Sequence, residues 1–280
     1  MEEKVKKLTL VVFLCVALLA VASVASAITW GVPDGNEHPY VGTLLFQRGD
    51  SFYSCTGTLL TPRVMLTAGH CVEEGDEPNL RTWVSFAESI TLPPLNDRDA
   101  AIAYLDANWL ATEAVIAHPE YNDYMAFPNT YDVGAVILSV PQGMGHAELP
   151  PLGLLDTLVT GQGRKDREFT VVGYGMQGFI PPFYGDAYER RKGTVSLIEI
   201  NSHFTGDEQS AKFTNNPGGG NGSGGTCYGD SGGPVFHGTS NVIGAVVSFG
   251  ITPCIGVDYQ FRIDTPVAQG FINSVLAQYP

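Results

Sequence analysis

Short apolar or alternating runs recur along this chain with turn residues between them, and this pattern constrains the fold more than any other feature. The 280 residues include 33 glycines and 18 prolines, a composition that suits many turns and disfavours long helices. Runs of this length and punctuation predict an all-β fold. The predicted strands cover residues 40–46, 54–60, 64–68, 83–86, 132–140, 169–174, 193–200 and 242–249.

The end of the chain carries the clearest helical pattern. Thr265 and Pro266 precede apolar residues at a 3.6-residue spacing, which predicts a C-terminal α-helix with proline in its first turn. We expect its apolar face to pack onto a β-barrel. Upstream, prolines and glycines interrupt the pattern between residues 141 and 163. We place a domain boundary there, between a domain of residues 28–150 and a domain of residues 151–280.

Residues 1–27 have the organisation of a secretory signal peptide. Three lysines precede an apolar run over residues 8–22, and the segment ends in Ala25-Ser26-Ala27. The apolar run is shorter than the roughly 20 residues that span a bilayer as a permanent helix. We therefore expect a secreted, extracellular protein without stable membrane insertion after cleavage, and a retained anchor is the alternative.

The cysteines point to disulfides. Cys15 lies within the predicted signal peptide, and Cys55, Cys71, Cys227 and Cys254 leave an even set in an exported chain. Three pairings are possible, of which the sequence-local one joins Cys55 to Cys71 and Cys227 to Cys254. Zinc is the rival interpretation, but the chain has no C-x-x-C spacing. We expect two disulfides and no metal.

The chain is strongly acidic. Cleavage after Ala27 leaves 12 basic and 27 acidic side chains, a formal charge of −15. Such a surface repels polyanions, so nucleic acid and anionic membranes are poor partners. The run Glu73-Glu74-Gly75-Asp76-Glu77 offers the clustered oxygens that Ca²⁺ requires, but it lacks an ordered ligand pattern. We expect a solvated acidic loop there.

Three segments carry a candidate nucleophile and its partners in the order His, Asp, Ser. They are Leu66-Thr67-Ala68-Gly69-His70-Cys71, Tyr131-Asp132-Val133-Gly134-Ala135-Val136-Ile137-Leu138 and Gly229-Asp230-Ser231-Gly232-Gly233-Pro234. A serine hydroxyl is a weak nucleophile until a neighbouring imidazole takes its proton. Asp123 competes with Asp132 for the role of the acid, but no apolar strand follows it. The remaining histidines are scattered without ligand spacing, and we expect them to be structural.

With these motifs the chain resembles the chymotrypsin/trypsin-like serine protease family. The resemblance continues in His118-Pro119-Glu120-Tyr121, Val172-Gly173-Tyr174-Gly175, Ser248-Phe249-Gly250 and the closing helix, so it covers essentially the whole mature chain. It implies two antiparallel six-stranded β-barrels with a C-terminal α-helix. The first barrel would carry His70 and Asp132, the second would carry Ser231, and the active site would lie between them.

The resemblance also implies the role of each residue. Ser231 attacks the peptide bond to form an acyl-enzyme, His70 transfers the proton, and Asp132 fixes the imidazole tautomer. Gly229 and Ser231 donate the N–H groups of the oxyanion hole. We expect protein or peptide substrates, no cofactor and a monomer.

Asp230 takes a different role by resemblance, because family members pair this residue with a newly exposed N-terminal amine. Cleavage after Ala27 would expose Ile28-Thr29-Trp30-Gly31, which is similar to the mature start of the family except that Trp30 stands where glycine is usual. We therefore expect signal peptidase itself to release the amine of Ile28, which then forms an ion pair with Asp230. The alternative is that Ile28 is only a neighbour of the cleavage site.

The resemblance places a substrate pocket with Gly225 at its floor and Ser248, Phe249 and Gly250 in its walls. An uncharged floor favours an apolar or aromatic residue before the scissile bond. Asp258 follows Cys254 in a segment that lines the same pocket in relatives. If its carboxylate points inward, the pocket would instead favour Arg or Lys.

Three departures from the family leave the catalytic residues in place. Only two of the family disulfides are present, residues 88–113 look like an insertion, and Phe249 stands where tryptophan is common. Two other functions stay open. One is a catalytically silent, protease-like binding module, and the other is an esterase that uses the same acyl chemistry on an easier leaving group.

Overall fold

The structure is a computed structural model that describes residues 28–73, 79–125, 127–160, 165–180, 183–185, 188–201, 209–216, 224–251 and 253–280. The predicted signal peptide, residues 74–78 of the acidic run and residues 217–223 of the glycine-rich approach to Ser231 lie outside the described residues.

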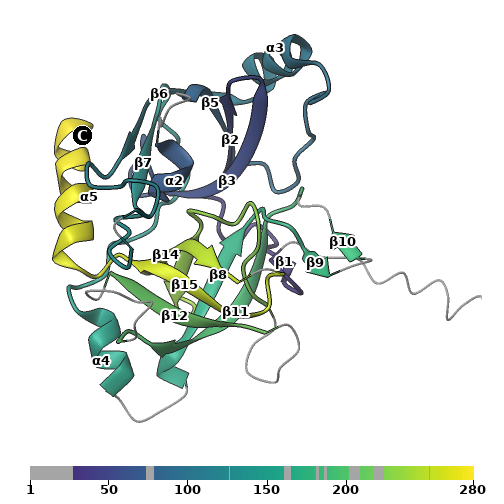
Figure 1. Ribbon diagram of the computed structural model, residues 1–280. Helices are drawn as coiled ribbons and strands as arrows, with labels where there is room; N and C mark the ends of the chain where they lie inside the picture. The colour runs from purple at the N-terminus through teal and green to yellow at the C-terminus, as the bar shows by residue number, and fades with distance from the viewer. Residues whose placement is uncertain are drawn as a thin grey trace, which may run out of the picture.

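The first six long strands close into an antiparallel barrel (Figure 1). Its strands are fully or largely buried where apolar residues follow one another, as in Gly134–Leu138, because they face the barrel core on one side and neighbouring elements on the other. The order around the barrel is β2-β3-β4-β7-β6-β5. The strands are β2 (Val41–Arg48), β3 (Ser51–Leu59), β4 (Val64–Thr67), β5 (Asn79–Ser85), β6 (Leu110–Ala117) and β7 (Gly134–Leu138).

The second barrel also has six antiparallel strands, in the order β11-β12-β15-β14-β13-β8, and it closes because β8 pairs with β11. Its strands are β8 (Glu168–Gly173), β11 (Arg191–Glu199), β12 (Ser210–Asn215), β13 (Pro234–His237), β14 (Ile243–Gly250) and β15 (Gly256–Arg262). The short strand β1 (Val32–Pro33) adds to β11, and β9 (Gly178–Ile180) pairs with β10 (Phe183–Gly185). The predicted all-β fold with two six-stranded barrels is confirmed.

Each predicted strand overlaps an observed one, but four barrel strands, β6, β12, β13 and β15, were not predicted. β15 was missed although its sequence, GVDYQFR, alternates apolar and polar residues from Val257 to Arg262, and its polar residues Asp258, Gln260 and Arg262 are buried together with its apolar ones. β6 has the sequence LATEAVIA, whose alanines and glutamate are more typical of a helix. β12 and β13 are too short to establish a period.

The predicted C-terminal helix is confirmed as α5 (Pro266–Gln278). The Thr265 hydroxyl accepts a hydrogen bond from the Ala268 N–H at its start, and Phe271, Ile272 and Val275 are buried on its inner face. These residues join an apolar cluster built from strands of both barrels, so the helix stabilises the contact between them.

Other helices occupy the connections. α2 (Gly69–Val72) follows β4, α3 (Arg98–Asn108) lies in the predicted insertion, and α4 (Leu154–Thr160) precedes the 3₁₀ turn η1 (Lys165–Arg167). α3 was not predicted, although Asp97 caps it through the Ala100 N–H at 3.1 Å. No helix in the described part of the chain is long and apolar enough to cross a membrane.

Candidate active site

His70 and Asp132 come from neighbouring strands of the first barrel. His70 lies in α2, directly after β4, and Asp132 lies two residues before β7. β4 and β7 pair with Thr67 opposite Gly134, so the chain leaves one strand and enters the other at the same end of the barrel. This register brings together two side chains that are 62 residues apart.

The buried Asp132 carboxylate accepts hydrogen bonds on both oxygens. Nδ1 of His70 lies 2.9 Å from Oδ2 and 3.0 Å from Oδ1, and the backbone N–H of His70 donates to Oδ1 at 2.8 Å. The Ser248 hydroxyl donates to Oδ2 at 2.5 Å. Because the carboxylate holds Nδ1, Nε2 is the ring nitrogen left for another partner.

Burial and the partner act in opposite directions on each member of this pair. Burial alone would lower the pKa of His70, but the charge and hydrogen bond of Asp132 outweigh it and raise that pKa above its ordinary value. Burial alone would raise the pKa of Asp132, but His70 and the other donors hold it below its ordinary value. An ionised carboxylate beside a more basic imidazole suits a histidine that takes up a proton.

Ser231 lies in a tight turn before β13 that is tied to the first barrel. Its carbonyl accepts a hydrogen bond from the Thr56 N–H of β3 at 2.8 Å. The turn contains Gly229 and Gly232 with φ of +96° and +77°, a region that only glycine adopts without strain. A Cβ at Gly232 would lie 2.0 Å from Oγ1 of Thr67, so the turn needs glycine there.

The turn leaves two backbone amides available to a ligand. The N–H groups of Asp230 and Gly233 donate to carbonyl groups of Cys227 and Asp230, at 3.0 and 2.8 Å. Those of Gly229 and Ser231 donate to no residue that the structure describes. An amide without a protein partner is normally taken by water or a ligand.

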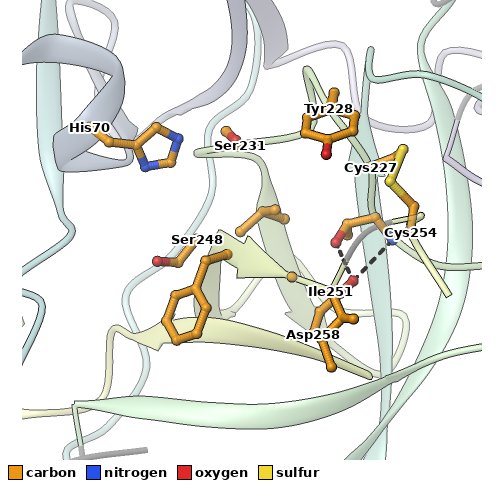
Figure 2. A pocket seen from close by; sticks show the side chains of 12 residues that line it. His70, Cys227, Tyr228, Ser231, Ser248, Ile251, Cys254 and Asp258 are labelled. Atoms are coloured by element: carbon orange, nitrogen blue, oxygen red, sulfur yellow. Dashed lines mark hydrogen bonds between the residues drawn. A yellow bond between two sulfur atoms is a disulfide. The ribbon is translucent and has the colours of Figure 1, made fainter. Parts of the chain in front are cut away.

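His70 and Ser231 both line one cavity of about 320 Å³. Figure 2 shows their side chains near one end of it and Asp258 across the cavity from His70. The predicted wall residues Ser248, Phe249 and Gly250 line it as well. The other lining residues are Thr226, Cys227, Tyr228, Val247, Ile251 and Cys254.

Asp258 forms the buried, charged end of this cavity. Its Oδ2 accepts a hydrogen bond from Nδ2 of Asn215 at 2.7 Å. It also accepts from both the backbone N–H and the hydroxyl of Thr226, the two dashed lines in Figure 2. Burial raises its pKa to about 6 in spite of these donors. Gly225 is not among the lining residues; it backs onto Asn215, because a Cβ there would lie 1.7 Å from Oδ1 of that residue.

Ile28 and Asp230 are both buried in the second barrel. In this chain the nitrogen of Ile28 is still bonded to Ala27, so it carries no charge. The Asp230 carboxylate accepts hydrogen bonds from the N–H groups of Gly175 and Cys227, at 2.7 and 2.9 Å. Burial nevertheless raises the pKa of Asp230 to about 7. No ion pair joins Asp230 to a residue in the described part of the chain.

The two disulfides join Cys55 to Cys71, across 16 residues, and Cys227 to Cys254, across 27 residues. These are the sequence-local pairings. The first fastens α2 to β3, and the second fastens the Ser231 turn to the segment before β15. Both disulfides therefore brace the walls of the site.

Sequence reasoning missed several residues of the site. Tyr124 contacts both His70 and Asp132, and Thr226 and Tyr228 line the cavity. A tyrosine in a loop carries no periodic signal. Only the presence of several aromatic residues between His118 and Asp132 could have drawn attention to it.

Two closed antiparallel barrels with a His–Asp pair and a serine on one cavity have the arrangement of a serine protease. The sequence model of the Trypsin family matches residues 30–272, and the chain belongs to this family. Family membership supports a peptidase function.

Two relatives agree with this assignment, and two solved structures share the fold. The chain is 29% identical over 232 residues to CLIP domain-containing serine protease B15 of Anopheles gambiae, covering 78% of this chain and 60% of that protein. It is 26% identical over 220 residues to a chymotrypsin of Phaedon cochleariae, covering 77% and 70% of the two chains. The fold is similar to that of HL collagenase, with a TM-score of 0.64, 17% identity and coverage of 90% and 99%. It is also similar to a mutant of human heparin binding protein, with a TM-score of 0.59, 17% identity and coverage of 90% and 96%.

Proposed function

We propose that this protein is a secreted serine endopeptidase that works through an acyl-enzyme. The observation that carries the proposal is the buried Asp132 carboxylate on Nδ1 of His70, with Ser231 on the same cavity as His70. Two disulfides and the signal-like residues 1–27 support export.

In the proposed reaction these groups act in turn. Nε2 of His70 takes the proton of the Ser231 hydroxyl while Oγ attacks the substrate carbonyl carbon. The amides of Gly229 and Ser231 then stabilise the oxyanion, and His70 passes the proton to the departing amine. Water repeats the sequence with the acyl-enzyme, which releases the acid and restores Ser231. Asp132 stays ionised throughout and stabilises the imidazolium.

For the side chain before the scissile bond, we propose that the cavity takes Arg or Lys. The stem would contact Val247, Phe249 and the disulfide, and the cation would reach Asp258 at the buried end. Hydrogen bonds to Asp258 fall on Oδ2, and no described residue donates to Oδ1. A Cβ at Gly250 would lie 2.5 Å from Oδ1, so this glycine leaves the oxygen uncovered. Apolar or aromatic specificity, which a floor at Gly225 would favour, is the alternative.

We further propose that the free amine of Ile28 activates the enzyme by pairing with Asp230. A buried carboxylate with a raised pKa and no cation nearby is the partner such an amine needs. Pairing would ionise Asp230 and fix the turn that carries Gly229 and Ser231.

The binding-module alternative has one structural neighbour in its favour, a protein named for heparin binding. Heparin is a polyanion, and the mature chain would carry a formal charge of −15, which disfavours such a ligand. An esterase would use the same residues and is separated from a peptidase by its substrates.

The test compares matched peptide amides and esters with Arg, Lys, Phe or Leu before the cleaved bond, using protein that starts at Ile28. We expect hydrolysis of both amides and esters of Arg or Lys, and a loss of about 10⁶-fold in kcat for Ser231→Ala. Cleavage of esters alone would indicate an esterase. Turnover that survives Ser231→Ala would refute the mechanism.

A further inference from the structure

Tyr124 is the third side chain, after His70 and Ser248, that donates a hydrogen bond to the Asp132 carboxylate. Its hydroxyl donates to Oδ2 at 2.8 Å, the oxygen that also accepts from Ser248, and lies 3.1 Å from Nδ1 of His70. Its ring centroid lies 6.2 Å from that of His70. Tyr124 therefore contacts both members of the pair at once.

The loop between β6 and β7 presents this side chain in an unusual backbone conformation. Asp123 and Tyr124 both have positive φ, 53° and 60°, which is uncommon for residues other than glycine and costly for a bulky side chain. The Tyr124 ring is held edge-on against Tyr121 and Phe249, with centroids 5.8 Å away in each case. Strained residues persist where their surroundings hold them, and here the packing holds the Tyr124 hydroxyl toward His70 and Asp132.

The direction of each proton follows from the tautomer that catalysis needs. Nδ1 of His70 must carry a proton and donate it to Asp132, so it cannot accept one from Tyr124. The Tyr124 proton therefore goes to Oδ2, and the lone pairs of its oxygen face the Nδ1–H. The tyrosine thus fills the side of the carboxylate where Asp132 could otherwise rotate away from the imidazole.

We propose that Tyr124 is a positioning residue for the His70–Asp132 pair, and that its hydroxyl sets both the orientation and the effective charge of the carboxylate. This inference rests on the proposed peptidase function. A donated hydrogen bond withdraws charge from the carboxylate, so it weakens the attraction between Asp132 and a protonated His70. Loss of the hydroxyl should therefore make His70 more basic while leaving the pair less well oriented.

Other charged and titratable groups around His70 are unaffected by this change. Arg48 donates to the backbone carbonyl of His70 at 3.0 Å and opposes its protonation, whereas Asp123 favours it. Arg48 also donates to the Glu73 carbonyl at 3.0 Å. The phenol of Tyr121 is neutral because burial raises its pKa. A shift seen on removing only the Tyr124 hydroxyl therefore belongs to that hydroxyl.

The experiment compares Tyr124→Phe with Tyr121→Phe, measuring kcat, KM and the pH dependence of kcat/KM. Tyr121 is the matched control, since its buried hydroxyl has no hydrogen-bond partner among the described residues. We expect Tyr124→Phe to lower kcat about tenfold with little change in KM, and to move the acid limb of the profile upward by about half a unit. The control should leave the acid limb where it is in the wild type.

A second variant tests the direction in which the acid limb of the pH profile shifts, and it keeps the Tyr124 hydroxyl. Incorporation of 3,5-difluorotyrosine at position 124 gives a stronger donor of nearly the same shape, so the acid limb should move downward. Covalent labelling of wild-type Ser231 by a phosphonate separates the Tyr124 proposal from the peptidase proposal. If the wild type labels but Tyr124→Phe behaves as the control, or if both changes at position 124 shift the limb in one direction, the Tyr124 proposal is overturned. If the wild type itself fails to label, the peptidase proposal fails.

Discussion

Freeing the amine of Ile28 should change how the stability of this protein depends on pH. In the uncut chain the buried Asp230 has a pKa raised to about 7, whereas an aspartate in an unfolded chain titrates near about 3.9. The folded state therefore binds more protons than the unfolded state between these values. The contribution of Asp230 to the free energy of unfolding is then greatest at low pH and falls as pH rises through the window from about 4 to about 7. The difference of about three pKa units between the folded and unfolded states corresponds to ~4 kcal/mol of the free energy of unfolding, at about 1.4 kcal/mol per unit.

A cationic amine beside Asp230 should remove this dependence, because it lowers the pKa of the carboxylate. The α-amino group stays protonated across most of this window. The assay is urea unfolding between pH 4.5 and 7.5, as about six steps of half a unit, of protein starting at Ile28 and of protein that retains Ala25-Ser26-Ala27 ahead of it. We expect the free energy of unfolding to fall with pH much more steeply in the extended form.

Two controls isolate Asp230 in this measurement. Asp258, whose pKa is raised to about 6 and whose charge contributes to the raised pKa of Asp230, is present in both forms, so Asp258→Asn in both removes its titration from the comparison. Asp230→Asn should make the pH profiles of the two forms parallel. The reasoning is refuted if the wild-type forms already have parallel profiles, or if the steep profile of the extended form survives Asp230→Asn.

Three further predictions concern the turn, the pocket and the His–Asp pair. Gly232→Ala should lower the free energy of unfolding in urea by roughly 3 kcal/mol or more and abolish turnover. The control Gly238→Ala, at a φ of +59° but with nothing within 4 Å of its Cβ, should lower it by only about 1 kcal/mol. Equal losses would show that the steric clash at Gly232 does not matter. Asp258→Asn should lower kcat/KM for Arg and Lys substrates by at least about tenfold relative to Phe and Leu substrates in a peptide-library profile, and an unchanged ranking would favour apolar specificity. In a pH–rate profile kcat/KM should reach half its maximum above about pH 6.5, because the pKa of His70 is raised; a half-maximum near pH 5 would exclude His70 as the base. Asp132→Asn should lower kcat about 10⁴-fold.

The sequence was most informative where local pattern and chemistry coincide. Alternating runs and turn residues predicted five of the six strands of the first barrel and three of the six of the second, and Thr265 with Pro266 predicted where α5 begins. The motifs around His70, Asp132 and Ser231, through their resemblance to the family, predicted that these three segments meet. For the strands and the helix the signal is carried by residues close together in the chain, whereas for the site it is carried by three short motifs that are far apart.

What stayed unpredicted depends on contacts between distant segments. The position of Asp258 depends on Asn215 and Thr226, which reach it from β12 and from the Ser231 turn. The contact of Tyr124 with Asp132 depends on two residues with positive φ, which no hydrophobic period records. Whether a side chain faces a cavity is decided by such contacts, and they become visible only when the strands are placed.

Covalent labelling of Ser231 measures whether His70 activates this serine as a nucleophile. Protein that starts at Ile28 is treated with a fluorophosphonate, and the modified peptide is identified by mass spectrometry, with Ser231→Ala and His70→Ala as controls. We expect one label, on Ser231, absent from the first control and formed far more slowly in the second. A folded protein that takes no label, or takes it equally well without His70, would show that Ser231 is not a nucleophile activated by His70.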